Sequence, residues 1–231
     1  MSVTRGNNQQ TANPVEQSTG TTITSNAIPT GLRKGDILVA GVNLASGTAT
    51  KPAGWTTHIS NLGTSAITYL DYLVVGTVSA LSNTYQWTGL TTGRADLFIT
   101  AFRGVNPFTP WDATGSVGTN TGSGNSCVIA AITTVSDNCM LVSAITGNAS
   151  TGPPVWTQPA GFTQVSHSTG TGKGAAYASD LFQGTAGSSG TQTWTWDQTN
   201  LEIRGVMGAL RPAPGETICV INQALSRSYN W

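Results

Sequence analysis

Short runs of apolar and β-branched residues, separated by Gly, Pro, Asn and Ser, follow one another along the chain from about Thr21. The run from Ile37 to Val42 is apolar on both faces of an extended chain, which indicates a central strand covered on both sides. Other runs alternate between apolar and polar positions, as half-buried strands do. Because the loops carry turn-forming residues and no helix-capping pattern, we predict an all-β chain.

Six strands are predicted before residue 106. They lie in TTITSNA (21–27), DILVAGVNLA (36–45), GWTTHISNL (54–62), TYLDYLVVG (68–76), NTYQWTGL (83–90) and RADLFITAFRGV (94–105). In the fifth of these, Tyr85 and Trp87 lie two apart and therefore project from one face of the strand. Trp194 and Trp196 repeat that spacing. We expect both pairs to fill a core between two sheets rather than to form a ligand platform.

The stretch KPAGWTTHIS at 51–60 recurs as QPAGFTQVSH at 158–167, with Pro-Ala-Gly, an aromatic residue and Thr in common. The likeness continues on the C-terminal side, where YLDYLVVGT (69–77) matches YASDLFQGT (177–185) at a spacing of 108 residues. A repeat of about 100 residues has the length of one β-sandwich unit. We therefore predict a β-sandwich of jelly-roll type, built from two homologous six-strand halves with extended N- and C-terminal arms.

The predicted organisation is an N-terminal arm (1–17), a first β repeat (18–105), a linker (106–121), a second β repeat (122–213) and a C-terminal arm (214–231). The sequence leaves open whether the halves form one composite sandwich or two tandem ones. A single compact body is favoured, because each half has few large apolar residues and gains by burying a face against the other.

Charge is scarce and balanced, with 10 basic and 10 acidic residues and a charged fraction of 9%. Nucleic-acid binding needs clustered Lys and Arg, so we expect no nucleic-acid partner. No stretch of about 18 apolar residues could span a bilayer, and the N-terminal residues lack the apolar core of a secretory signal. We therefore expect no membrane partner and assembly in a cytoplasm.

Catalytic and metal-binding patterns are weak. Cys127, Cys139 and Cys219 lack the spacing of a metal site and are expected to be free thiols. Asp71 is unusual because it lies in the middle of a predicted strand, but a structural carboxylate, either solvated or hydrogen-bonded, is favoured over a catalytic one. Asp36 and Asp137, at the starts of equivalent strands, are expected to accept backbone N–H bonds in turns. We predict no enzyme activity, no catalytic residue, no cofactor and no metal.

Two loop tryptophans suggest an alternative role in carbohydrate binding. Trp111 and Trp156 lie in Pro-rich loops, and an exposed indole on a β-sandwich can stack on a sugar ring. The favoured interpretation is that each ring folds inward and closes an end of the sandwich.

Four residues are candidates for an interface. Arg103 and Arg211 end equivalent strands, and we expect each guanidinium to bond loop carbonyls or a neighbouring subunit. Tyr229 and Trp231 end the C-terminal arm and are large side chains suited to a pocket on a neighbour. The competing interpretation is that the arms fold back on their own domain or stay loose.

The order of GDILVA, PAGWT, TYQWTG and AFRGV, followed by a second set that closes in GALRP, resembles a β-sandwich module of bacteriophage virion proteins and of some bacterial surface proteins. The resemblance covers about residues 20–213 and implies a structural or adhesive role. The expected function is that of a capsid decoration or cement protein on the virion surface, bound to the major capsid protein as a homotrimer. The alternative is a tail or baseplate module for host recognition or carbohydrate binding.

Overall fold

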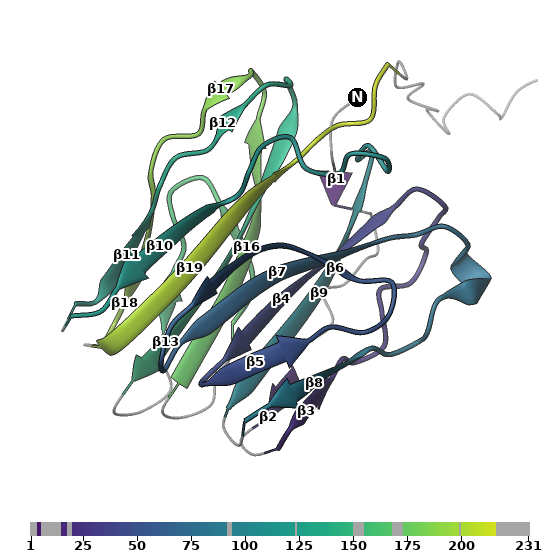
Figure 1. Cartoon of the computed structure of the whole chain (residues 1–231). Coiled ribbons are helices and arrows are strands. Elements are labelled where there is room, and N and C mark those ends of the chain that lie inside the picture. The colour runs from purple at the N-terminus through teal and green to yellow at the C-terminus, as the bar shows by residue number, and fades with distance from the viewer. Residues whose placement is uncertain are drawn as a thin grey trace, which may run out of the picture.

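The computed structural model describes residues 4–5, 15–17, 20–91, 94–122, 124–149, 155–167, 173–198 and 200–215. Within these ranges the chain forms β-strands and one short 3-10 helix, η1 (Val78–Ala80), and it contains no α-helix (Figure 1). The strands make curled antiparallel sheets in a sandwich-like arrangement, which confirms the predicted all-β class. The jelly-roll connectivity, the division into homologous halves and the segment boundaries stay predictions.

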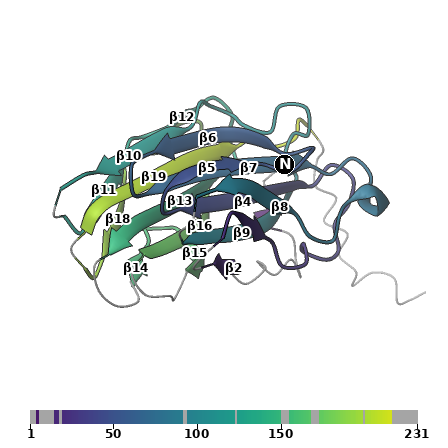
Figure 2. The same ribbon diagram turned by 60° about the horizontal axis from the view of Figure 1, so that its bottom comes forward.

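The first large sheet comes from the N-terminal part of the chain and pairs its strands in the order β1-β9-β4-β7-β6, with β2 also beside β9. A small sheet with the order β3-β8-β5 covers one of its faces (Figure 2). The strands of these two sheets are β1 (Thr4–Arg5), β2 (Val15–Gln17), β3 (Thr22–Thr24), β4 (Ile37–Leu44), β5 (Gly47–Thr50), β6 (Thr56–Leu62), β7 (Ile67–Val74), β8 (Gln86–Leu90) and β9 (Ala95–Arg103).

The second large sheet has eight strands in the order β14-β18-β11-β10-β19-β13-β16-β15. Its strands are β10 (Ser116–Asn120), β11 (Ser126–Ile129), β13 (Cys139–Ala149), β14 (Trp156–Thr157), β15 (Thr163–His167), β16 (Lys173–Gln183), β18 (Gln192–Trp196) and β19 (Asn200–Leu210). Two short strands, β12 (Thr133–Thr134) and β17 (Gly187–Ser188), pair outside it. Four strands of the second sheet, β19-β13-β16-β15, follow the same order as β9-β4-β7-β6 in the first sheet. In both runs the last of the four strands along the chain lies beside the first, followed by the third and then the second.

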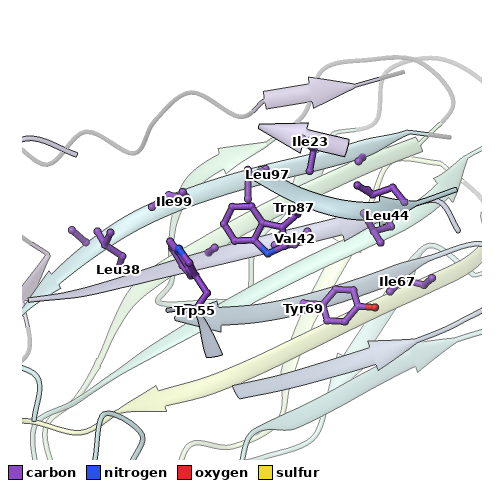
Figure 3. Packing of buried hydrophobic residues seen from close by; sticks show 14 of the residues in the cluster. Ile23, Leu38, Val42, Leu44, Trp55, Ile67, Tyr69, Trp87, Leu97 and Ile99 are labelled. Carbon is purple, nitrogen blue, oxygen red and sulfur yellow. The ribbon is translucent and has the colours of Figure 1, made fainter. Parts of the chain in front are cut away.

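Apolar side chains fill three layers. One cluster lies between the small sheet and the first large sheet and contains Trp87, Trp55 and Leu97 (Figure 3). A second lies inside the curl of the second large sheet, where Trp194 of β18 packs over β13 and β19. The third cluster joins the two large sheets and includes Phe98 of β9 and Val206 of β19. The two large sheets therefore share a buried face, as expected for one compact body.

Strand β4 shows why the stack forms. Leu38, Ala40 and Val42 belong to the cluster under the small sheet, whereas Ile37 and Val39 belong to the cluster between the large sheets. Because side chains alternate along a strand, an apolar run is required where both faces are covered. The prediction of a central strand covered on both sides is confirmed.

A polar network also joins the two large sheets, at the end where β19 begins. The carboxylate of Glu202 accepts hydrogen bonds from the backbone N (2.6 Å) and the Oγ (2.7 Å) of Ser65 in the turn between β6 and β7. Arg204 donates from Nε to the same carboxylate at 2.8 Å, and Asn61 of β6 donates from Nδ2 to the carbonyl of Gly118 at 2.7 Å. Although burial opposes ionisation, the bonds from Ser65 and Arg204 lower the pKa of Glu202 to about 2.

The strand predictions for the first half are largely correct, but three strands were not predicted. The six predicted strands correspond to β3, β4, β6, β7, β8 and β9. The additional strand β5 has the sequence GTAT, which is too short and too weakly apolar to be recognised. Part of the predicted N-terminal arm also forms strands, because β1 and β2 both pair with β9.

Candidate functional site

The candidate site is the end of the molecule where β9 and β19 finish. Arg103 is the last residue of β9, and Arg211 follows β19 directly. The segment after β9 turns back beside the residues that follow β19, close to β1 (Figure 1). Backbone bonds from Asn106 N to the Arg211 carbonyl (2.9 Å) and from Ala213 N to the Gly104 carbonyl (2.8 Å) hold the two segments together. We call this region the arginine end.

Arg103 forms a two-point ion pair with Asp36. Its Nε and Nη2 atoms donate to the two carboxylate oxygens at 3.0 and 2.8 Å, and Nη2 also donates to the carbonyl of Gly31 at 3.0 Å. The hydrogen bond to Asp36 raises the pKa of Arg103 above its ordinary value. Asp36 in turn accepts from the backbone N of Arg33 at 2.8 Å, which confirms its predicted role in a turn.

Arg211 has an equivalent arrangement with a different partner. Its Nε donates to Asp112 Oδ1 at 3.0 Å, Nη1 donates to Thr109 Oγ1 at 3.2 Å, and Nη2 donates to the Asp112 carbonyl at 3.3 Å. Asp112 also accepts from the backbone N atoms of Val135 and Ser136. Burial works against ionisation of Asp112, but the bonds from Ser136, Val135 and Arg211 hold its pKa below the usual value.

Both arginines therefore bind loop carbonyls and carboxylates of their own chain, in line with the structural half of the prediction. Their side chains keep 31% and 29% of their surface exposed, so part of each guanidinium still faces outward. The interface role stays a prediction. Tyr229 and Trp231, the other two interface candidates, lie outside the described residues.

Trp111 closes the layer between the two large sheets. Its indole stacks on the imidazole of His58, with ring centroids 3.8 Å apart and planes 4° from parallel, and the edge of Tyr72 meets it at 5.8 Å. Burial lowers the pKa of His58 to about 4, so the imidazole is neutral at physiological pH. This packing agrees with the favoured interpretation of a loop aromatic that folds inward.

Trp156 is buried more deeply than Trp111. It is 3% exposed and packs against Trp194 and Trp196, at centroid distances of 6.3 and 4.4 Å. Stacking on a sugar needs an open ring face, and the ring of Trp156 offers none. The carbohydrate alternative therefore retains only the partly exposed Trp111, one face of which His58 covers.

The close packing around Trp111 leads to a prediction for Gly208. A Cβ atom on Gly208 would lie 2.5 Å from Cζ3 of Trp111, so Gly208→Ala should displace the indole from His58. We expect a loss of about 1–2 kcal/mol in the free energy of unfolding, with a change in near-ultraviolet circular dichroism. Gly76→Ala is the control, because no atom lies within 4 Å of its added Cβ. Equal stability of the two variants would contradict the packing described.

The buried carboxylate of Asp71 serves the scaffold. Its oxygens accept hydrogen bonds from Trp87 Nε1 and Thr57 Oγ1, both at 2.7 Å. Burial raises the pKa of Asp71, and the bonds from Trp87 and Thr57 oppose that rise. The indole of Trp194 has a neutral acceptor instead, Ser143 Oγ at 3.0 Å. The expected structural role of Asp71 is confirmed.

The remaining candidate groups also have local roles. Asp137 accepts from the backbone N of Ala186 at 2.7 Å, as predicted for a turn carboxylate. Cys127 and Cys139 are free and buried, and burial raises the pKa of each thiol to about 12, which suppresses the nucleophilic thiolate. Cys219 lies outside the described residues.

No group of three or more His, Cys, Asp and Glu side chains among the described residues is placed to hold a metal ion. Likewise, no helix among them is long and apolar enough to cross a membrane.

The sequence interpretation missed one residue at the arginine end. Phe108, three residues before Trp111, is 93% exposed, the largest value among the exposed large hydrophobic residues. The signal was present in the sequence, because Asn-Pro-Phe-Thr-Pro places an aromatic residue between two prolines in a turn.

Comparisons with known proteins gave no relative. No protein-family model matches the chain, and no curated protein or solved structure matches it either. The function is therefore argued from the residues themselves.

Proposed function

We propose that this chain is a structural protein of a virus particle, a decoration or cement protein that binds the outside of a phage head. Its partner is the major capsid protein, and it binds as a homotrimer. The resemblance of the strand motifs to phage virion modules is the starting point for this proposal. The proposed role needs no catalytic group, only a stable body and a surface that attaches it to the shell.

The arrangement of the arginine end supports the proposal most directly. Strand β1 pairs with the end of β9, in the register Thr4 with Arg103, and the last described residues, 211–215, run beside the same segment. The two outermost described segments thus lie together at one end of a stack of sheets (Figure 1). A protein that docks end-on through its arms and adjacent loops would have this arrangement.

The energetics of the body fit the same role. The scaffold's buried charges are neutralised internally, as in the pairs Arg103–Asp36, Arg211–Asp112 and Arg204–Glu202. A body with no net charge and three apolar layers can add stability to a shell through burial of surface rather than through long-range attraction.

Cosedimentation tests the proposal. Purified protein should bind saturably to heads of the virus that encodes it when those heads are assembled without it, and should raise the temperature at which the heads rupture. Heads already saturated with the protein are the control and should take up no more. If the protein stays in the supernatant and binds host cells instead, the recognition alternative replaces this proposal.

A further inference from the structure

Phe108 projects from the arginine end on a loop that carries no charged residue. The loop runs from Asn106 to Pro110, and the phenyl ring is 93% exposed. Burial of an apolar ring of this size is favourable, so an exposed phenylalanine leaves that free energy unused in the isolated chain. Single exposed apolar residues are common, so the case for function depends on how the loop is held.

Hydrogen bonds hold the loop on both sides. Inside it, Asn106 Oδ1 accepts from the backbone N atoms of Phe108 (3.0 Å) and Thr109 (3.3 Å). Arg211, which lies outside the loop, holds it with two further bonds. Its backbone N donates to the Pro110 carbonyl (2.8 Å), and its Nη1 donates to Thr109 Oγ1 (3.2 Å). These bonds fix the backbone that presents Phe108, so the loop loses little backbone entropy when the ring binds.

The surroundings of Phe108 select the kind of partner. Arg211 is the cation nearest to the loop in this hydrogen-bond network, and Asp112 neutralises it. Binding to nucleic acid or to an anionic membrane needs several free cations beside the aromatic residue. An isolated phenyl ring in a neutral setting fits best into an apolar pocket on a protein.

The position of the loop connects it with the rest of the chain. The Ala213 N to Gly104 carbonyl bond (2.8 Å) places the start of residues 214–231 next to the segment that leads into the loop. Strand β1, on the N-terminal side, pairs with Arg103 and Phe102 at the end of β9. A partner that contacts β1 or the residues around Ala213 would therefore also lie close to the loop of Phe108.

We infer that Phe108 is the anchor of the shell contact, and that it inserts into an apolar pocket on the major capsid protein. The inference rests on the proposed function and adds the contact residue and the face. Arg211 holds the loop through its bonds to Pro110 and Thr109 and does not itself fill the pocket.

The test compares binding of purified variants to heads assembled without the protein. Phe108→Ala should weaken binding about 10- to 30-fold, while Phe108→Leu should recover part of the loss. The matched control is Leu62→Ala, since Leu62 is also exposed (57%). Leu62 lies at the end of the first sheet opposite to the arginine end. It is in the same cross-strand row as Ile67, Leu44 and Ala95, and Ala95 begins β9 whereas Arg103 ends it.

The outcomes separate this inference from the proposed function. If the wild-type protein binds and Phe108→Ala binds equally well, the anchor is wrong and the proposed function stands. If the wild-type protein fails to bind heads, both are overturned. If Phe108→Ala instead dissociates an oligomer, as measured by light scattering, and still binds heads with wild-type affinity, the ring fits a second copy of the chain and the inference is wrong.

Discussion

Glu202→Ala is expected to lower the free energy of unfolding by about 3–5 kcal/mol, the largest effect of any single substitution proposed for this chain. Glu202 is buried and accepts bonds from Ser65 in the turn after β6 and from Arg204 on its own strand. Its removal leaves the Arg204 guanidinium without its carboxylate and leaves the Ser65 backbone N–H without its acceptor. Chemical denaturation monitored by tryptophan fluorescence would measure the loss.

Two controls identify the cause of that loss. Asp197→Ala removes an exposed carboxylate that accepts one bond, from Val155 N at 2.9 Å, and should cost less than about 1 kcal/mol. In a double-mutant cycle, Ser65→Ala and Glu202→Ala should couple by about 1 kcal/mol or more. Additive effects of the two substitutions would contradict the bond from Ser65 Oγ to Glu202.

The pH dependence of stability has a definite sign for Glu202. Its pKa is lowered in the folded protein from 4.5 to about 2, so the carboxylate contributes stability above pH 4.5 that is lost as the pH falls towards 2. Glu202→Ala should therefore flatten the acid side of the stability curve, whereas an unchanged acid limb would show that other carboxylates dominate it.

The sequence predicted much of the fold because local patterns control it. The doubly buried run from Ile37 to Val42 and the aromatic spacing of Trp194 and Trp196 follow directly from the alternation of side chains along a strand. Strand β5 was missed because GTAT carries almost no apolar signal, and its pairing with β8 depends on the tertiary structure. The pairing of β1 and β2 with β9 could not be predicted for a similar reason, since a polar segment gives no register.

The site was harder to predict than the strands. Arg103 and Arg211 were identified because both end equivalent strands of the predicted repeat. The partner of Arg211, however, is Asp112, a residue 99 positions away in the predicted linker. Nothing in a single sequence indicates a pairing over such a separation. The inward orientation of Trp156 was the favoured interpretation, but its pairing with β18 was not predicted, because residue type and loop composition do not indicate a partner strand.

Trp87→Phe is expected to lower the free energy of unfolding by about 3 kcal/mol at neutral pH. For Trp194→Phe the expected loss is about 2 kcal/mol. Both indoles are fully buried and both donate from Nε1, so the two substitutions remove the same atoms from comparable environments. The difference lies in the acceptor, because Trp87 donates to the carboxylate of Asp71 and Trp194 to the hydroxyl of Ser143. A buried carboxylate that loses a donor is destabilised more than a buried hydroxyl.

The pH dependence of the Trp87→Phe effect separates the charge from the packing. Burial already raises the pKa of Asp71 above 3.8, and the bond from Trp87 opposes that rise, so the substitution should raise the pKa further. A raised pKa favours the folded state below the unfolded value, and this advantage is lost as the pH rises through the folded value. The cost of Trp87→Phe should therefore shrink as the pH falls from about 7 to about 4, while the cost of Trp194→Phe stays constant.

A parallel pH dependence of both variants would mean that lost ring volume explains both effects and that Asp71 is neutral throughout. Asp71→Asn in the Trp87→Phe background decides between the two, because it should recover stability only if the ionised carboxylate is the source of the cost.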